Sequence, residues 1–201
     1  YIFFLTGQKP KTIAAMNSQR IYGNKDKPFD LLCKNCDEKM ECVESPFNLF
    51  YKRFAGGKVE WNDWQKCVFS REIKNEDSGN ALIELNNGVQ VSYTQNFFVR
   101  NQKVARRGAR LYGYKGTIDF DWYRNTIIVY DHFTPIVETI EFTGDMPHFG
   151  GDRELAYDFL MAMKEKRPSR SPMEAGITSA LACLWARESA EKRQFFEVKM
   201  P

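Results

Sequence analysis

The stretch that decides the fold is residues 107–119, Arg-Gly-Ala-Arg-Leu-Tyr-Gly-Tyr-Lys-Gly-Thr-Ile-Asp, together with residues 120–142 directly after it. Residues 110–112, 117–121, 126–130 and 136–142 are short runs rich in β-branched and aromatic side chains. Turn residues separate these runs, namely Gly113, Gly116, Asn125 and Pro135. Short strands divided by turn residues predict consecutive hairpins in an antiparallel sheet.

Upstream of this stretch the same pattern continues. Ala81, Ile83 and Leu85 alternate with polar residues, Asn87-Gly88 comes next, and residues 89–93 alternate again. An Asn-Gly pair between alternating runs is the strongest short hairpin signal. Residues 11–21 are expected to be extended, and residues 1–7 have the pattern of a helix end closed by Gly7. This abrupt start leads us to expect a further part upstream of Tyr1.

Two helices are expected downstream. Residues 147–152, Pro-His-Phe-Gly-Gly-Asp, precede the first, with Asp152 as its predicted cap and Pro168 as its end. Its apolar residues at four-residue spacing are Leu155, Phe159 and Met163.

The second helix opens at Ser171-Pro172-Met173-Glu174, a capping pattern with proline at the first helical position. Its predicted buried face consists of Ile177, Leu181, Leu184 and Trp185, and Cys183 is expected in the core. Residues 195–198 form a last predicted strand. Hairpin-linked strands and then two helices predict an α+β fold, an open-faced, mostly antiparallel sheet with helices on one face.

Composition excludes several classes. The chain has 201 residues with 43% hydrophobic content, which suits a single domain with a sizeable core. The net charge of +3 is too small to indicate a nucleic-acid partner. The sequence contains no apolar run of the roughly 20 residues that a membrane span needs, and no signal segment opens it. A cytoplasmic protein is therefore expected.

The order of strands, His148-to-Asp152 stretch and two helices resembles the C-terminal half of the Gfo/Idh/MocA oxidoreductases. The resemblance implies one domain, residues 1–201, that shapes the substrate pocket and the subunit interface. In the implied enzyme, NAD or NADP binds a separate N-terminal Rossmann domain, the substrate is a sugar, inositol or similar polyol, and the protein is a homodimer or homotetramer.

The same resemblance implies that His148 and Asp152 lie near the substrate, although this family usually has glycine where Phe149 stands. The alternative is a capping turn with His148 on the surface. Asn96 and Arg100, on the segment after Tyr93, are the other candidate substrate residues, although arginine at a hairpin rim is usually solvated.

The sequence contains no G-x-G-x-x-G fingerprint after an N-terminal strand and no Glu-Lys-Pro run, which in the family supplies a catalytic lysine. We therefore expect no catalytic and no cofactor-binding residue in this chain, and no activity from the chain alone.

Residues 22–57 have the composition of an inserted loop, with a short helix expected at 46–54. Three cysteines fall in ten residues of it, and the full set is Cys33, Cys36, Cys42 and Cys67. Cys-x-x-Cys spacing suits a tetrahedral zinc ion of structural role. Free thiols in a reducing compartment are the equally weighted alternative. The rival to the enzyme is therefore a non-catalytic, zinc-stapled module that binds carbohydrate or a protein partner.

Overall fold

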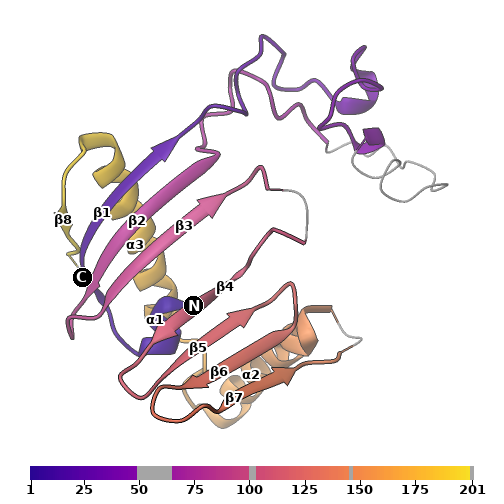
Figure 1. Cartoon of the computed structure of the whole chain (residues 1–201). Helices are drawn as coiled ribbons and strands as arrows, with labels where there is room; N and C mark the ends of the chain where they lie inside the picture. The colour runs from indigo at the N-terminus through magenta and orange to yellow at the C-terminus, as the bar shows by residue number, and fades with distance from the viewer. Residues whose placement is uncertain (49–64, 100–102, 145–146, 200–201) are drawn as a thin grey trace. The chain divides into compact units, whose positions relative to one another are not determined.

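The computed structural model describes residues 1–48, 65–99, 103–144 and 147–199. The chain divides into two compact units, which are described separately. The first comprises residues 1–98 and 180–201, and the second comprises residues 99–179. Each contains one four-stranded antiparallel sheet (Figure 1).

The sheet of the first unit has the strand order β3-β2-β1-β8. Its strands are β1 (Pro10–Ser18), β2 (Ser78–Leu85), β3 (Gln90–Asn96) and β8 (Phe196–Glu197), and the short helix α1 (Ile2–Thr6) precedes β1. The β2–β3 hairpin turns at Gly88, whose φ of 83° lies in the left-handed region that the Asn-Gly signal requires. Gly7 likewise ends α1 in a left-handed conformation, as predicted.

Alternation on these strands separates an apolar face from a polar one. Ile13, Ala81, Ile83 and Leu85 are buried together with Ala182 of helix α3 (Met173–Lys192). The opposite face carries a cross-strand polar ladder. Ser78 Oγ donates to Asn96 Oδ1 at 2.9 Å, and Thr94 Oγ1 donates to Asn80 Oδ1 at 2.9 Å. The first unit is therefore a sheet with one helix-covered apolar face.

Helix α3 contacts this core through its small residues. Ala182 is buried, Trp185 and Ala186 are partly buried against the core, and Ser189 is 1% exposed. The Ser189 hydroxyl accepts a hydrogen bond from Ala15 N at 2.8 Å, which ties the helix to β1.

The predicted buried face of α3 was wrong in part, because Ile177 and Leu184 are exposed. Cys183, predicted to be core, is also exposed. The small residues Ala182 and Ser189 allow close approach, and they face the sheet together with Trp185.

A buried carboxylate directly before β2 holds the first residues of the loop that follows β1. Asp77 is 1% exposed, and its Oδ2 accepts hydrogen bonds from the backbone N–H groups of residues 20, 21 and 22 at 2.9, 2.6 and 3.1 Å. Burial acts to raise the pKa of Asp77, but these amide bonds outweigh it and the pKa is lowered. The loop is thus anchored where it leaves the sheet.

The sheet of the second unit has the order β4-β5-β6-β7. Its strands are β4 (Gly108–Tyr112), β5 (Gly116–Asp121), β6 (Thr126–Asp131) and β7 (Val137–Glu141), and η3 (Pro147–Gly150) leads into α2 (Gly151–Glu165). Gly108 and Gly116 face the backbone of the neighbouring strand so closely that an added Cβ would clash with Phe120 O and Tyr130 O. Both glycines are therefore required for strand pairing.

The central strand β5 buries polar side chains. Thr117, Asp119 and Asp121 are at most 9% exposed, whereas Ile118, on the other face of the strand, is 41% exposed. Arg106 and Arg110 pair with Asp119, and Arg124 pairs with Asp121. The second sheet thus buries carboxylates whose arginine partners remain about half exposed.

A second buried carboxylate closes the connection between α2 and α3. Asp158 of α2 is 3% exposed and accepts hydrogen bonds from Arg167 Nη1 at 2.8 Å, Ser169 Oγ at 2.7 Å and Arg170 N at 2.9 Å. The bonds from Ser169 and then Arg167 hold the pKa of Asp158 well below its usual range. Helix α2 ends at Glu165, three residues before Pro168, in keeping with the predicted stop.

The α+β class and the antiparallel strands are as the sequence predicts. The strands are divided between two four-stranded sheets, one in each unit. Most of the range 46–54, where a short helix is predicted, falls in residues 49–64, which lie outside the described residues.

Candidate functional site at the start of helix α2

The turn before α2 has an unusual backbone. His148, Phe149 and Gly150 are consecutive residues with φ of 50°, 54° and 78°. Left-handed backbone is uncommon for residues other than glycine, and for a bulky residue such as Phe149 it is strained. The surrounding structure therefore has to hold this turn in place.

The ring of Phe149 provides that anchor. It meets Trp122, which comes directly after β5, edge to face with ring centroids 5.6 Å apart. The Arg107 guanidinium lies over the Trp122 ring, 5.1 Å from its centroid. Phe149 thus fixes the turn to the end of the central strand.

His148 and Asp152 form a pair across the first turn of α2. His148 Nδ1 and Asp152 Oδ2 are 2.8 Å apart, and the two side chains are 66% and 74% exposed. The prediction that Asp152 caps the helix was wrong, because Gly150 occupies the cap position and no side chain caps the helix. The pairing engages Nδ1, so Nε2 is the nitrogen that can meet a ligand hydroxyl or carbonyl.

The other predicted substrate residues lie elsewhere. Asn96 is the last residue of β3 in the first unit, where it accepts the bond from Ser78. Arg100 lies outside the described residues. His132, the second histidine, bonds within the second sheet, with Nε2 2.9 Å from Thr117 Oγ1.

The arginines near the candidate site have carboxylate partners that sequence reasoning missed. Arg110 Nε donates to Asp119 Oδ2 at 2.7 Å, and the hydrogen bond from Arg110 to Asp119 raises the arginine pKa. The signal was present in the sequence, because Thr117, Asp119 and Asp121 alternate along one strand and so share a face. Arg106 and Arg110 thus act as internal partners of the sheet.

The loop from β1 to β2 brings the two cysteine-bearing segments together. Leu32 and Lys66 form an antiparallel bridge, flanked by Cys33 N to Gln65 O at 2.8 Å and Cys67 N to Leu31 O at 2.9 Å. The short helix η1 (Cys33–Asn35) then turns the chain so that Cys36 N donates to Cys33 O at 3.2 Å. Burial, and then the charges of Cys67, Cys42 and Cys36, raise the pKa of Cys33.

The thiols nevertheless do not form a finished ligand shell. Within the described ranges, no group of three or more histidine, cysteine, aspartate or glutamate side chains is arranged to hold a metal ion. All four loop cysteines are free and partly buried.

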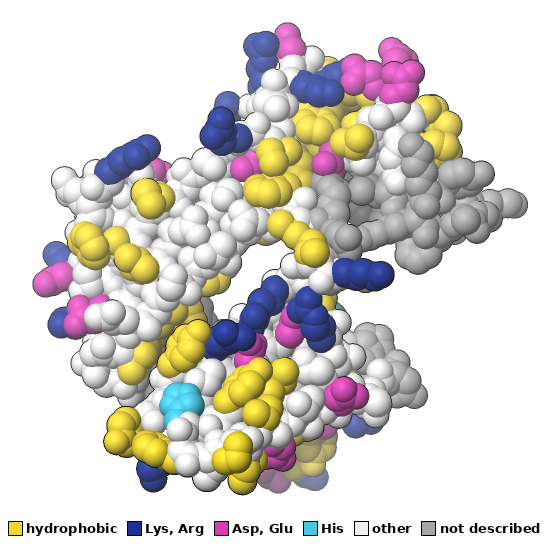
Figure 2. Space-filling model, viewed as in Figure 1, with side chains coloured by type: hydrophobic (Ala, Val, Ile, Leu, Met, Phe, Trp, Pro, Cys, Tyr) yellow, Lys and Arg dark blue, Asp and Glu magenta, His cyan; other side chains and the backbone are white. Residues whose placement is uncertain are grey.

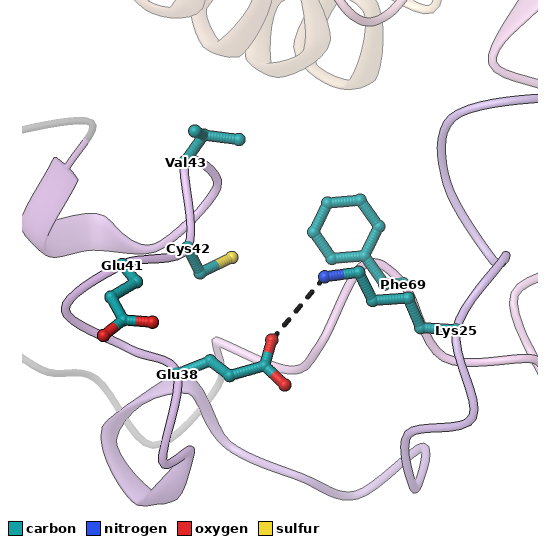
Figure 3. Close-up of a pocket in the computed structure, with 6 residues that line it drawn as sticks. All are labelled: Lys25, Glu38, Glu41, Cys42, Val43 and Phe69. Atoms are coloured by element: carbon teal, nitrogen blue, oxygen red, sulfur yellow. Dashed lines mark ion pairs between the residues drawn. The ribbon is translucent and has the colours of Figure 1, made fainter.

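A hollow of about 270 Å³ opens beside this loop, lined by Lys25, Glu38, Glu41, Cys42, Val43 and Phe69 (Figure 3). Lys25 Nζ is 3.6 Å from Glu38 Oε2 and lies over the Phe69 ring, 4.7 Å from its centroid. The hollow is open to solvent and its lysine pairs with one of its glutamates, so it offers little to a ligand.

Apolar side chains also reach the surface (Figure 2). Met16 and Leu82 are exposed on the first sheet, on the face away from α3. Leu155, Phe159 and Met163 of α2 are each more than half exposed. The spacing of these α2 residues was predicted, but the structure shows no partner for them among the residues it describes.

Solved structures share this fold. An oxidoreductase domain protein from Kribbella flavida aligns with a TM-score of 0.67 and 13% identity over 99% of this chain and 48% of its own. Levoglucosan dehydrogenase, in complex with NADH and L-sorbose, aligns with a TM-score of 0.62 and 17% sequence identity. This alignment covers 96% of the present chain and 46% of the dehydrogenase chain. UDP-N-acetylglucosamine 3-dehydrogenase GnnA from Acidithiobacillus ferrooxidans aligns with a TM-score of 0.58 and 17% sequence identity. This alignment covers 94% of the present chain and 43% of the GnnA chain.

The TM-scores show a common fold, and at these low sequence identities they show the fold alone. The chain spans less than half the length of each of these structures. A scan against protein-family models and a search of curated proteins gave no match. Among the helices that the structure describes, none combines the length and apolar character needed to cross a membrane.

Proposed function

We propose that this chain is the C-terminal, substrate-binding domain of a Gfo/Idh/MocA-type oxidoreductase that uses NAD or NADP. The observation that carries the proposal is the alignment of nearly the whole chain with about half of several dehydrogenases, one of them in complex with NADH and a sugar. The substrate class proposed for this chain is accordingly a sugar, inositol or similar polyol.

In this proposal one domain binds the cofactor and another binds the substrate. A Rossmann domain outside this chain binds the nicotinamide, which supplies the hydride chemistry, and it contributes the catalytic groups. This chain positions the substrate and excludes water. It contains no glycine-rich dinucleotide fingerprint, so the chain alone is expected to be inactive.

His148 is the residue proposed to contact the substrate. Asp152 accepts from Nδ1 and so fixes the ring and its tautomer, and Nε2 then accepts a hydrogen bond from a sugar hydroxyl. The anchor of Phe149 on Trp122 supports this role, because a ring held by a rigid turn loses little freedom when ligand binds. Asn96, the last residue of β3, and Arg100, which lies outside the described residues, remain proposed as further substrate residues.

The test uses the longer polypeptide encoded upstream of Tyr1, assayed with NAD and NADP against a panel of sugars and polyols. His148→Asn is expected to lower kcat/KM by about 10- to 100-fold, the worth of one good hydrogen bond to substrate. His132→Asn is the matched control, since His132 bonds inside the sheet and is expected to affect stability without raising KM. Unchanged kinetics in His148→Asn would remove His148 from the site.

A carbohydrate- or partner-binding module without chemistry is the second candidate, favoured by the exposed apolar residues of α2. The same assay separates the two, because such a module binds its ligand without consuming nicotinamide. An unrelated domain upstream of Tyr1 would favour the module.

A further inference from the structure

The described part of the cysteine loop has almost no apolar core of its own. The buried apolar cluster of the protein is formed by β1, β2 and α3, and the residues buried in the loop include Ser45 and Ser70. Long loops are uncommon in compact domains unless something holds them. In its described part, two isolated bridges join the two sides of the loop, Lys25 to Ser70 and Leu32 to Lys66.

The backbone nevertheless places the four thiols around one part of this loop. Cys33 and Cys67 lie on the two segments joined by the Leu32–Lys66 bridge. Cys36 comes after Cys33 in one tight turn, and Cys42 N bonds to Glu38 O at 2.8 Å in the next turn. A Cys-x-x-Cys turn is thus joined by an isolated bridge to a segment that carries a further cysteine, and Cys-x-x-Cys spacing is typical of structural zinc sites.

The charges near the cysteines have both signs and include a lysine that interacts with two of them. Lys27 is partly buried, and its Nζ lies 2.6 Å from Glu38 Oε1. The hydrogen bond to Glu38 and, more weakly, the charges of Glu38, Cys36 and Cys67 raise the pKa of Lys27. A cation beside two cysteines offsets part of the negative charge that four thiolates would bring to one metal ion.

We propose that Cys33, Cys36, Cys42 and Cys67 bind one structural zinc ion that staples this loop to the start of the sheet. The sulfur atoms are not arranged as a shell in the structure, so binding draws the two cysteine turns together and the metal orders the loop as it binds. Each thiol loses its proton to solvent and becomes a thiolate ligand, with no change of oxidation state. Four protein ligands leave no open position, so the ion has no catalytic role.

The experiment measures metal in the chain purified under reducing conditions without chelator. About one zinc ion per chain is expected, with a marked loss in Cys36→Ser and in Cys67→Ser. Cys183→Ser is the matched control, because Cys183 is the one cysteine outside the loop and is exposed on α3; that variant should keep its zinc.

A second measurement guards against variants that fail to fold. In the wild-type chain, a thiol reagent should modify Cys183 quickly and the other four cysteines only after a chelator removes the metal. Cobalt substitution should add the visible absorption of tetrahedral thiolate coordination. The proposal is overturned if wild-type protein holds no zinc and all five thiols react at once. It is overturned equally if mass spectrometry shows the loop thiols joined as disulfides.

Discussion

Ile13 and Asp119 occupy comparable places, each on an inner strand of a four-stranded antiparallel sheet, yet one is an aliphatic side chain and the other a charged one. Ile13 is fully buried against Ala81, Ile83, Leu85 and Ala182. Asp119 is 9% exposed and paired with Arg106 and Arg110. The buried hydrophobic cluster belongs entirely to the first unit, as far as the described residues go.

The two units therefore differ in the kind of side chain that their inner strands bury. The first unit gains stability from burial of apolar area beneath α3. The second buries carboxylates that pair with half-exposed arginines, so the loss of one arginine would leave a buried charge unpaired. Its aliphatic residues, such as Ile118, retain much of their contact with solvent.

A pair of matched truncations tests this comparison and has the largest expected effect. Ile13→Ala should lower the free energy of unfolding by about 2–5 kcal/mol, as for other buried aliphatic residues. Ile118→Ala, on the inner strand of the second sheet, should cost about 1 kcal/mol or less, because its side chain is already 41% exposed. Urea denaturation measures both. Equal costs would mean that the apolar face of the second sheet is covered in solution.

The loss of unfolding free energy at acid pH is expected to come largely from a carboxylate of the second unit. The pKa of Asp158 in the folded state lies below its ordinary value of 3.8. The unfolded chain therefore takes up a proton before the native one does. The stability that Asp158 contributes is complete above about pH 5 and is lost as the pH falls through 3.8 toward the folded pKa. Asp158→Asn should destabilise the protein at neutral pH and flatten its stability profile between about pH 5 and pH 3.

Denaturant titrations at a series of pH values measure this profile. Asp152→Asn is the control, since that carboxylate lies in the same helix and is 74% exposed. An acid limb as steep in Asp158→Asn as in the wild type would show that other carboxylates, Asp77 of the first unit among them, set the pH dependence.

Self-association is expected to arise from the uncovered face of the first sheet, in keeping with the proposed family. Sedimentation at micromolar concentration should show a dimer or a larger species. Leu82→Glu, placed among exposed residues of that face, should weaken it, whereas Phe195→Glu, exposed after α3, should not.

This is the smallest expected effect, because much of the same face is polar. Its hydrogen-bonded side chains contribute little to the free energy of association for the area that they bury. They are Ser78, Asn80, Thr94 and Asn96. A strictly monomeric wild-type chain would contradict the prediction.

Sequence reasoning succeeded where the signal is local. The Asn87-Gly88 turn, the end of α1 at Gly7 and the β-strands of the second sheet are consequences of dipeptide chemistry and period-two alternation. It failed where partners distant in sequence decide the outcome. Hydrophobicity alone chose Ile177 and Leu184 for the buried side of α3, whereas close packing selected Ala182 and Ser189.

The candidate site was predictable in its residues but not in its geometry. The His148-to-Asp152 stretch is visible in the sequence. In the structure, however, the left-handed Gly150 occupies the cap position of α2, and Asp152 forms a hydrogen bond with His148 instead. The Phe149–Trp122 contact that anchors the turn joins residues distant in the chain and has no sequence pattern. The carboxylate partner Asp119 could have been found from its alternation with Thr117 and Asp121 on one strand.

Calorimetry of nicotinamide binding tests the central claim most directly, with this chain and the polypeptide extended upstream of Tyr1 titrated side by side with NAD and NADP. The account predicts binding to a defined site in the extended polypeptide only, because the phosphate-binding glycines are expected there and this chain has no such fingerprint. Micromolar binding by this chain alone, or none by either protein, would contradict the assignment of this chain as the substrate-binding half of a nicotinamide-dependent oxidoreductase.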